Sequence, residues 1–145
     1  MTEETPPYGQ EDTSFRSAGE FDGVKQLVDD FYDIMETVPE GAHIVRMHPK
    51  DLTVSRDKLT RFLCGWLGGP KLFSEKYGSI AIPMAHQHLR IGIEERDAWL
   101  FCMQKAIGKQ PYADSFKKYL FEQLCVPAER TRIVSEKIHS QASPE

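Results

Sequence analysis

Imidazole side chains are the first groups in this chain that could do chemistry, because a neutral ring nitrogen can bind a metal ion or accept a proton. No histidine lies four residues from another, the spacing that places two imidazoles on one helix face for zinc. His86 and His88, two residues apart, would diverge on a short helix and converge in an extended loop. Taken alone, each histidine is interpreted as a surface or structural residue; the five are His43, His48, His86, His88 and His139.

Cysteine spacing and motif searches exclude several other kinds of chemistry. The three cysteines have no close pairing, which argues against both a disulfide framework and a zinc site; they are Cys64, Cys102 and Cys125. No serine nucleophile elbow, P-loop or Gly-x-Gly-x-x-Gly is present. The acidic pair Asp29-Asp30 is interpreted as part of a solvated helix face. Reduced, mostly buried thiols are expected.

Four segments with the apolar spacing of amphipathic helices must position these side chains. They begin near residues 21, 51, 94 and 112, and the first three end near residues 38, 67 and 107. Pro127 must kink or divide the last segment. No segment alternates with period two, so the predicted fold class is all-α.

The connections between these segments are marked by glycine and proline. Gly68-Gly69-Pro70 ends the second helix, because glycine supplies a left-handed cap and proline blocks continuation. Residues 40–50 are predicted to be turn-rich, and residues 71–84 to be loop-like.

Composition predicts one domain and excludes some partners. The 145 residues are expected to divide into a flexible arm (1–12), a domain (13–140) and a flexible tail (141–145). The net charge of −4 makes nucleic acid an unexpected partner. No apolar run reaches the roughly 20 residues that span a bilayer, and the first ten residues are acidic and polar where a signal peptide would be basic and then apolar. A cytoplasmic protein without membrane contact is expected.

Several short strings, in order, resemble one known family. They are FYD (31–33), MHPKDL (47–52), FLCGWLGGP (62–70) and ERDAWLFCM (95–103). Over about residues 21–124 the chain resembles the truncated haemoglobins of the second group. The resemblance implies a two-over-two helical sandwich, with main helices lettered B, E, G and H, around a b-type haem. Because Cys-x-x-Cys-His is absent, that haem would be bound non-covalently.

The resemblance implies His86, six residues before Gly92, as the iron ligand, with His88 as the competing assignment. The family's usual propionate-binding arginines are replaced by Pro83 and Ala85. Their substitutes would come from Lys58, Lys76, Tyr77 and Arg90. The full set of implied haem contacts is His86, Phe62, Leu63, Trp66, Leu72, Phe73, Tyr77, Arg90 and Met103.

On the opposite side of the haem, the resemblance implies a polar ligand pocket made by Tyr32, His48, Ser55, Leu59 and Trp99. Its phenol, imidazole and indole offer three candidate hydrogen-bond donors to a ligand that gains negative charge. The family usually has a Gly-Gly pair before the first long helix, where this chain has Gly19-Glu20.

The leading functional hypothesis is reversible, tight binding of dioxygen, with nitric oxide and carbon monoxide as further ligands. The alternative is a peroxidase-like or nitric-oxide-detoxifying enzyme that depends on an external reductase. A third is a helical interaction module that has lost haem. The expected assembly is a monomer or weak dimer.

Overall fold

The computed structural model describes residues 8–78 and 90–142. Its helices are α1 (Thr13–Ser17), α2 (Glu20–Thr37), η1 (Pro39–Gly41), α3 (Ala42–Val45), α4 (Thr53–Trp66), α5 (Leu72–Tyr77), α7 (Ile93–Gly108) and α8 (Asp114–Ala142). No strand occurs in these two described ranges, which confirms the all-α prediction.

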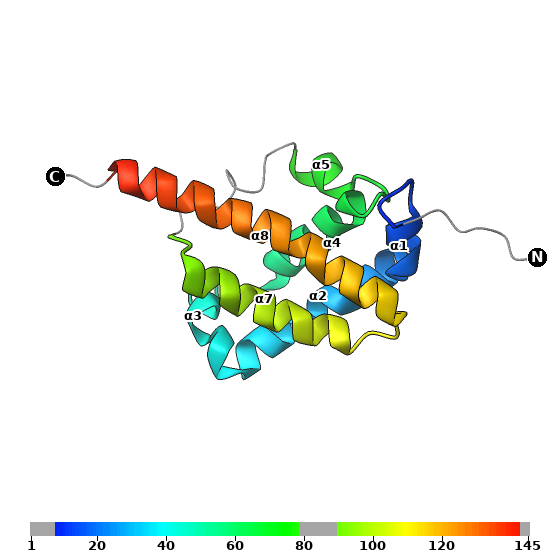
Figure 1. Cartoon of the computed structure of the whole chain (residues 1–145), viewed down its shortest axis with the longest axis horizontal. Helices are drawn as coiled ribbons and strands as arrows, with labels where there is room; N and C mark the ends of the chain where they lie inside the picture. The colour runs from blue at the N-terminus through cyan, green and yellow to red at the C-terminus, as the bar shows by residue number, and fades with distance from the viewer. Residues whose placement is uncertain (1–7, 79–89, 143–145) are drawn as a thin grey trace, which may run out of the picture.

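Two helix pairs form the body of the molecule. Helix α2 packs against α4, α7 packs against α8, and α2 and α7 join the pairs. In Figure 1, α7 and α8 lie in front and run in opposite directions, with α2 and α4 behind them. Apolar side chains on the inner faces make one core; its fully buried large members include Phe31, Phe116, Leu27, Met35, Leu63 and Met103. This is the two-over-two arrangement that the resemblance implied.

Helix α2 begins where the backbone turns into the left-handed region. Gly19 has φ 90° and Glu20 has φ 60°, so Glu20 adopts a conformation that favours glycine. An added Cβ on Gly23 would lie 2.0 Å from the Ala18 carbonyl oxygen, so this helix turn also needs glycine. Gly-Glu, where the resemblance implied Gly-Gly, therefore enters the helix through two consecutive left-handed residues.

Helix α4 ends in a Schellman motif. Gly68 has φ +95°. The Gly69 N–H donates to the Cys64 carbonyl at 2.9 Å, and the Gly68 N–H donates to the Gly65 carbonyl at 3.0 Å. The Leu67 carbonyl in turn accepts a hydrogen bond from the Phe15 N–H at 3.0 Å, which ties this end to α1. The predicted glycine cap is confirmed.

Three sequence-based expectations differ from the structure. The stretch expected as a loop contains α5, a helix of six residues, too short to show a clear apolar period. The turn-rich stretch contains η1 and α3. Of the two effects expected of Pro127, a kink or a division, the division does not occur, since α8 continues through it. Pro127 cannot donate a helix hydrogen bond, but its carbonyl still accepts one from the Thr131 hydroxyl at 2.8 Å.

Within the segment expected as a flexible arm, Tyr8 packs on helix α8. Its ring lies 5.2 Å from the ring of Phe116 and 5.1 Å from that of Tyr119, and its hydroxyl lies 2.8 Å from the Ser115 hydroxyl. The chain is thus anchored from Tyr8 onward, five residues ahead of α1.

Candidate functional site: a polar pocket between helices

Tyr32 points from α2 into the interior and is only 5% exposed. Its ring meets the Phe31 ring at 5.0 Å and the His48 ring at 5.6 Å, both edge to face. Burial raises the pKa of Tyr32 to about 12, an effect that the nearby charge of Arg56 partly offsets. The phenol therefore stays protonated at neutral pH and can donate a hydrogen bond.

Trp99 reaches the same region from α7. Its ring lies 5.1 Å from the Phe31 ring, so Phe31 contacts both Tyr32 and Trp99. Within residues 8–78 and 90–142, no group accepts a hydrogen bond from the Tyr32 hydroxyl or from the Trp99 indole N–H. Two donors whose rings contact the same phenylalanine, and which have no acceptor among the described residues, are suited to a polar ligand.

His48 completes the polar group, but with one nitrogen already engaged. Its Nδ1 lies 2.8 Å from the Ile44 carbonyl oxygen, which can only accept. Nδ1 therefore carries the proton, and in the neutral ring Nε2 is an acceptor. His48 is brought beside Tyr32 as expected, but the neutral imidazole does not supply the third donor.

The predicted apolar contacts come from α4, α5 and α7. Leu63 and Met103 are buried in the core, whereas Leu59, Phe62, Leu72 and Trp99 contact the core but remain partly exposed. Ser55 is also partly exposed. Phe73 meets Phe62 at 6.4 Å and Tyr77 at 5.2 Å, so an aromatic run continues from α4 along α5.

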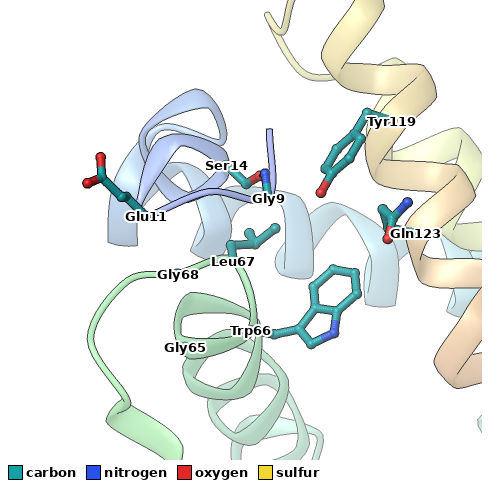
Figure 2. Close-up of a pocket in the computed structure, with 9 residues that line it drawn as sticks. All are labelled: Gly9, Glu11, Ser14, Gly65, Trp66, Leu67, Gly68, Tyr119 and Gln123. Carbon is teal, nitrogen blue, oxygen red and sulfur yellow. The ribbon is translucent and has the colours of Figure 1, made fainter. Parts of the chain in front are cut away.

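Trp66 lies apart from the distal residues. It lines a separate cavity of about 250 Å³ between the segment before α1, the end of α4 and helix α8. Figure 2 shows its indole directed toward Tyr119 and Gln123 of α8. The remaining lining residues are Gly9, Glu11, Ser14, Gly65, Leu67 and Gly68.

A charged cluster forms where α4 meets α5. The Asp57 carboxylate accepts hydrogen bonds from the Tyr77 hydroxyl at 2.5 Å, from Lys76 Nζ at 2.9 Å and from Arg61 Nε at 2.9 Å. These bonds, with that from Tyr77 the strongest, hold the pKa of Asp57 near 2. The Lys58 ammonium lies 5.3 Å from the centre of the Tyr77 ring. Lys58, Lys76 and Tyr77 are thus gathered together.

The fourth candidate for the propionates, Arg90, is exposed at the start of the second described range. The chain that follows it is fixed by two backbone donors. The Ile91 N–H donates to the Ser135 hydroxyl at 2.8 Å, and the Gly92 N–H donates to Glu95 at 2.7 Å.

The two candidate iron ligands, His86 and His88, lie outside the described residues. Among residues that the structure does describe, no cluster of three or more histidine, cysteine or acidic side chains could hold a metal ion. Cys64 and Cys102 are free and buried, and burial raises the pKa of each thiol to about 11.

Sequence reasoning missed Phe31 as the bridging ring and Arg56 as a neighbour of Tyr32. It also interpreted Asp29 as part of a solvated face, whereas its carboxylate accepts a hydrogen bond from Arg56. The available signal was the spacing of Asp29, Asp33 and Glu36, which places three carboxylates on one face of a helix. Three carboxylates on one helix face are expected to pair with a cation on a neighbouring element.

Comparison with known proteins defines the class. Residues 13–126 match the bacterial-like globin family. The chain belongs to this family, and the two helix pairs are its globin domain.

Within the family it is a group II truncated haemoglobin. It is 35% identical to the group 2 truncated haemoglobin YjbI of Bacillus subtilis over 101 residues, 70% of this chain and 74% of that protein. The structure resembles the group II 2-on-2 haemoglobin of Agrobacterium tumefaciens with a TM-score of 0.79 and 30% identity, covering 91% and 98% of the two chains. It also resembles the truncated oxygen-avid haemoglobin of Bacillus subtilis, with a TM-score of 0.74 and 30% identity over 81% and 97% of the chains.

Membership of this family implies haem, and the residues present fit that group. Large apolar side chains at the pocket, Leu59, Phe62, Leu72 and Trp99, pack on the core yet stay partly exposed, as surfaces that a porphyrin could cover. The two donors without acceptors in the described residues come from different helix pairs, Tyr32 from α2 and Trp99 from α7. In the described parts of the chain, no helix is long and apolar enough to cross a membrane.

Proposed function

We propose that this globin binds dioxygen reversibly and tightly, and that nitric oxide and carbon monoxide enter the same pocket. The observation that carries the proposal is that Tyr32 and Trp99 both contact Phe31, while neither the Tyr32 hydroxyl nor the Trp99 indole N–H has an acceptor among the described residues. The description of the similar Bacillus subtilis protein as oxygen-avid supports it.

When bound, ferrous haem would supply the iron at which dioxygen binds and gains negative charge. The chain contributes hydrogen bonds to the resulting negative charge, from the phenol of Tyr32 and the indole of Trp99. Phe31 packs against both rings and limits their movement. Leu59 and Phe62 add apolar surface to the surroundings of these donors, and a less polar environment strengthens a hydrogen bond.

We assign the iron ligand to His86 and expect haem b to be held without a covalent bond, since Cys-x-x-Cys-His is absent. The cations gathered around Asp57 outnumber its single charge. Lys58, Arg61 and Lys76 are therefore suited to hold haem propionates, with Tyr77 as a hydrogen-bond donor.

We also propose an external reductase as a partner, because dioxygen binding requires ferrous iron. A monomer or weak dimer is the proposed assembly. The large apolar side chains that are most exposed in the described regions are spread over three helices; they are Val54, Ile93, Val126 and Ile133.

Absorption spectra of the purified protein test the proposal. The wild type should show a haem Soret band, release its haem into acidified organic solvent, and change spectrum reversibly with dioxygen. His86→Ala should lose the five-coordinate ferrous signature, whereas His88→Ala should keep it. The opposite behaviour of the two variants would move the iron ligand to His88, and a colourless protein that takes up no added haem would overturn the proposal.

A further inference from the structure

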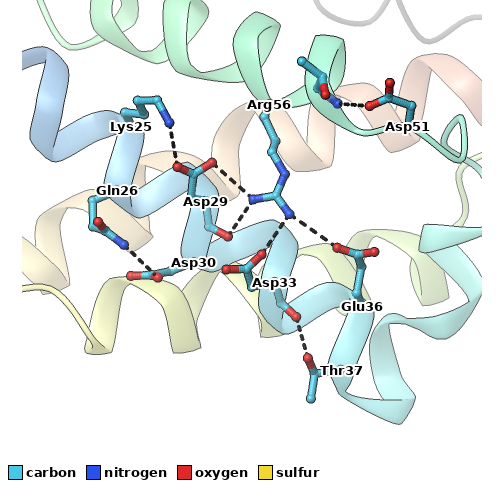
Figure 3. A network of polar contacts seen from close by, with 10 residues as sticks. Lys25, Gln26, Asp29, Asp30, Asp33, Glu36, Thr37, Asp51 and Arg56 are labelled. Carbon is cyan, nitrogen blue, oxygen red and sulfur yellow. Dashed lines mark hydrogen bonds and ion pairs between the residues drawn. The ribbon is translucent and has the colours of Figure 1, made fainter.

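Arg56 extends from α4 to the neighbouring helix α2 and is held there by acceptors on several sides. Its guanidinium donates to the Asp29 carbonyl at 3.1 Å and to the carboxylates of Asp29 at 3.2 Å, Asp33 at 2.8 Å and Glu36 at 3.3 Å. Figure 3 shows these acceptors on successive turns of α2 around the one guanidinium. The planar fork is thus fixed in place and orientation.

The electrostatics show how closely this group is held. Burial by itself would raise the pKa of Asp29, but hydrogen bonds from Lys25 and Arg56 outweigh it, so the pKa falls below its ordinary value. Only 24% of the Arg56 side chain is exposed, less than that of the two acidic partners Asp33 and Glu36. A guanidinium in this position has little freedom to leave.

The same guanidinium covers the distal tyrosine. Its central carbon lies 5.5 Å from the centre of the Tyr32 ring, within the range of a cation–π interaction. The Phe31 and His48 rings contact the phenol as well. Among the contacts of the Tyr32 ring within residues 8–78 and 90–142, Arg56 supplies the charge, and it is anchored to the helix that carries Tyr32.

We propose that Arg56 is a positioning residue for Tyr32: fixed by the carboxylates of α2, it holds the phenol ring in the orientation from which the hydroxyl reaches a ligand in the distal pocket. This inference rests on the proposed function. It assigns ligand retention in part to an ion pair network outside the pocket. The competing explanation is that Arg56 only joins α2 to α4.

Dioxygen dissociation in matched variants separates the two explanations. Arg56→Met keeps most of the aliphatic stem and removes the charge, and it should speed dissociation about two- to fivefold, the size of a cation–π contribution. Lys25→Met is the control, because Lys25 also binds Asp29, at 2.8 Å, but lies about two helical turns before Tyr32 along α2. It should leave dissociation unchanged.

A double-mutant cycle shows whether Arg56 acts through Tyr32. In a Tyr32→Phe background, Arg56→Met should add no further acceleration. The same acceleration in both backgrounds would overturn the proposal in favour of simple helix packing. Should Arg56→Met not fold, Asp33→Asn removes the negative charge from the nearest acceptor of the guanidinium and should act in the same direction, more weakly.

A spectroscopic readout does not depend on ligand release. In fluorotyrosine-labelled protein in its carbon monoxide form, the fluorine signal lost in Tyr32→Phe belongs to Tyr32. That signal should shift or broaden in Arg56→Met and stay in place in Lys25→Met; an unmoved signal in both would overturn the role of Arg56. If Tyr32→Phe itself leaves dioxygen dissociation unchanged, the donor role of Tyr32 in the proposed function fails as well. If Tyr32→Phe accelerates dissociation but Arg56→Met does not, only the positioning role of Arg56 is overturned.

Discussion

The polar residues of the distal pocket differ in what they can donate. The Tyr32 phenol remains protonated because burial raises its pKa to about 12, and an indole N–H can only donate. His48 donates its Nδ1 proton in a hydrogen bond to the Ile44 carbonyl. The proposed function therefore assigns two donors to the ligand, Tyr32 and Trp99, in place of the three that residue types alone suggest.

This difference makes a prediction for His48. At about pH 8, where histidine is ordinarily neutral, His48→Leu should change the rate of dioxygen dissociation by less than about threefold, because no donor is lost. Tyr32→Phe should accelerate it roughly 10- to 100-fold, the effect of losing a hydrogen bond to a charged group. Stopped-flow measurement on both variants checks this. An acceleration in His48→Leu as large as that in Tyr32→Phe would show that His48 donates through Nε2.

At the scale of elements, the end of α4 shows why two adjacent glycines are needed for different reasons. Gly68 needs its left-handed backbone, and a Cβ there would lie 2.0 Å from the Glu11 carbonyl oxygen. Gly69 has no such backbone, but a Cβ would approach the Phe15 ring within 2.6 Å. The sequence predicted the helix end from Gly-Gly-Pro; it could not predict that α1 packs against it.

Alanine substitutions should rank these positions by the cause of the strain. Gly68→Ala should lower the free energy of unfolding by at least about 2 kcal/mol, because left-handed strain and overpacking add. Gly69→Ala should cost less, since a ring can shift where a backbone carbonyl cannot. Gly108→Ala is the control: a Cβ there meets nothing within 4 Å, so it should be neutral or stabilising. Thermal and denaturant unfolding measure all three, and equal stability of Gly68→Ala and Gly108→Ala would refute the account.

The long helices could be predicted from sequence because each has an apolar face that repeats over several turns. Their observed ends, such as Thr37 before Val38-Pro39, lie close to the predicted ones. Helix α5 could not be predicted, since its order depends on contacts with α4 such as that of Phe73 with Phe62. The continuity of α8 through Pro127 is likewise a tertiary effect, because packing on α7 outweighs one missing hydrogen bond.

At the scale of the whole molecule, carboxylates with lowered pKa join helices to one another. Asp57 links α4 to α5 through Lys76 and Tyr77, and Glu129 on α8 binds Arg96 of α7 at 2.6 Å. The pKa of Asp57 falls from 3.8 to about 2, mainly through the bond from Tyr77. That of Glu129 falls from 4.5 to about 2, mainly through the bond from Arg132.

These pKa values fix the sign of an acid effect on stability. A group with a lower pKa in the folded state stabilises the fold above its unfolded pKa, and this stabilisation is lost as the pH falls through the folded value. The melting temperature should therefore fall as the pH is lowered from about 4 to 2. In Asp57→Asn and in Glu129→Gln, the melting temperature should fall by less over this range than in the wild type. Melting curves across this range measure it; variants with the full wild-type drop would show that these carboxylates do not contribute.

The candidate site was predictable to the extent that its residues stand in recognisable strings. Tyr32, His48 and Trp99 do so. In the structure the Tyr32 ring contacts those of Phe31 and His48, and the Trp99 ring contacts that of Phe31. The tautomer of His48 was not predictable, because it is set by the Ile44 carbonyl one helical turn earlier. Nor was the separate position of Trp66, which depends on where α8 crosses the end of α4.

The central claim is that hydrogen bonds from distal donors retain dioxygen on this globin, and Trp99→Phe tests it most directly. The substitution removes the indole N–H and keeps most of the apolar volume. Dissociation of dioxygen should accelerate about 10- to 100-fold, since a hydrogen bond to a charged group contributes about 1.5 to 3 kcal/mol. Dissociation of carbon monoxide, which gains less charge, should change much less. Equal small changes for the two ligands would contradict the account and leave Trp99 as a packing residue.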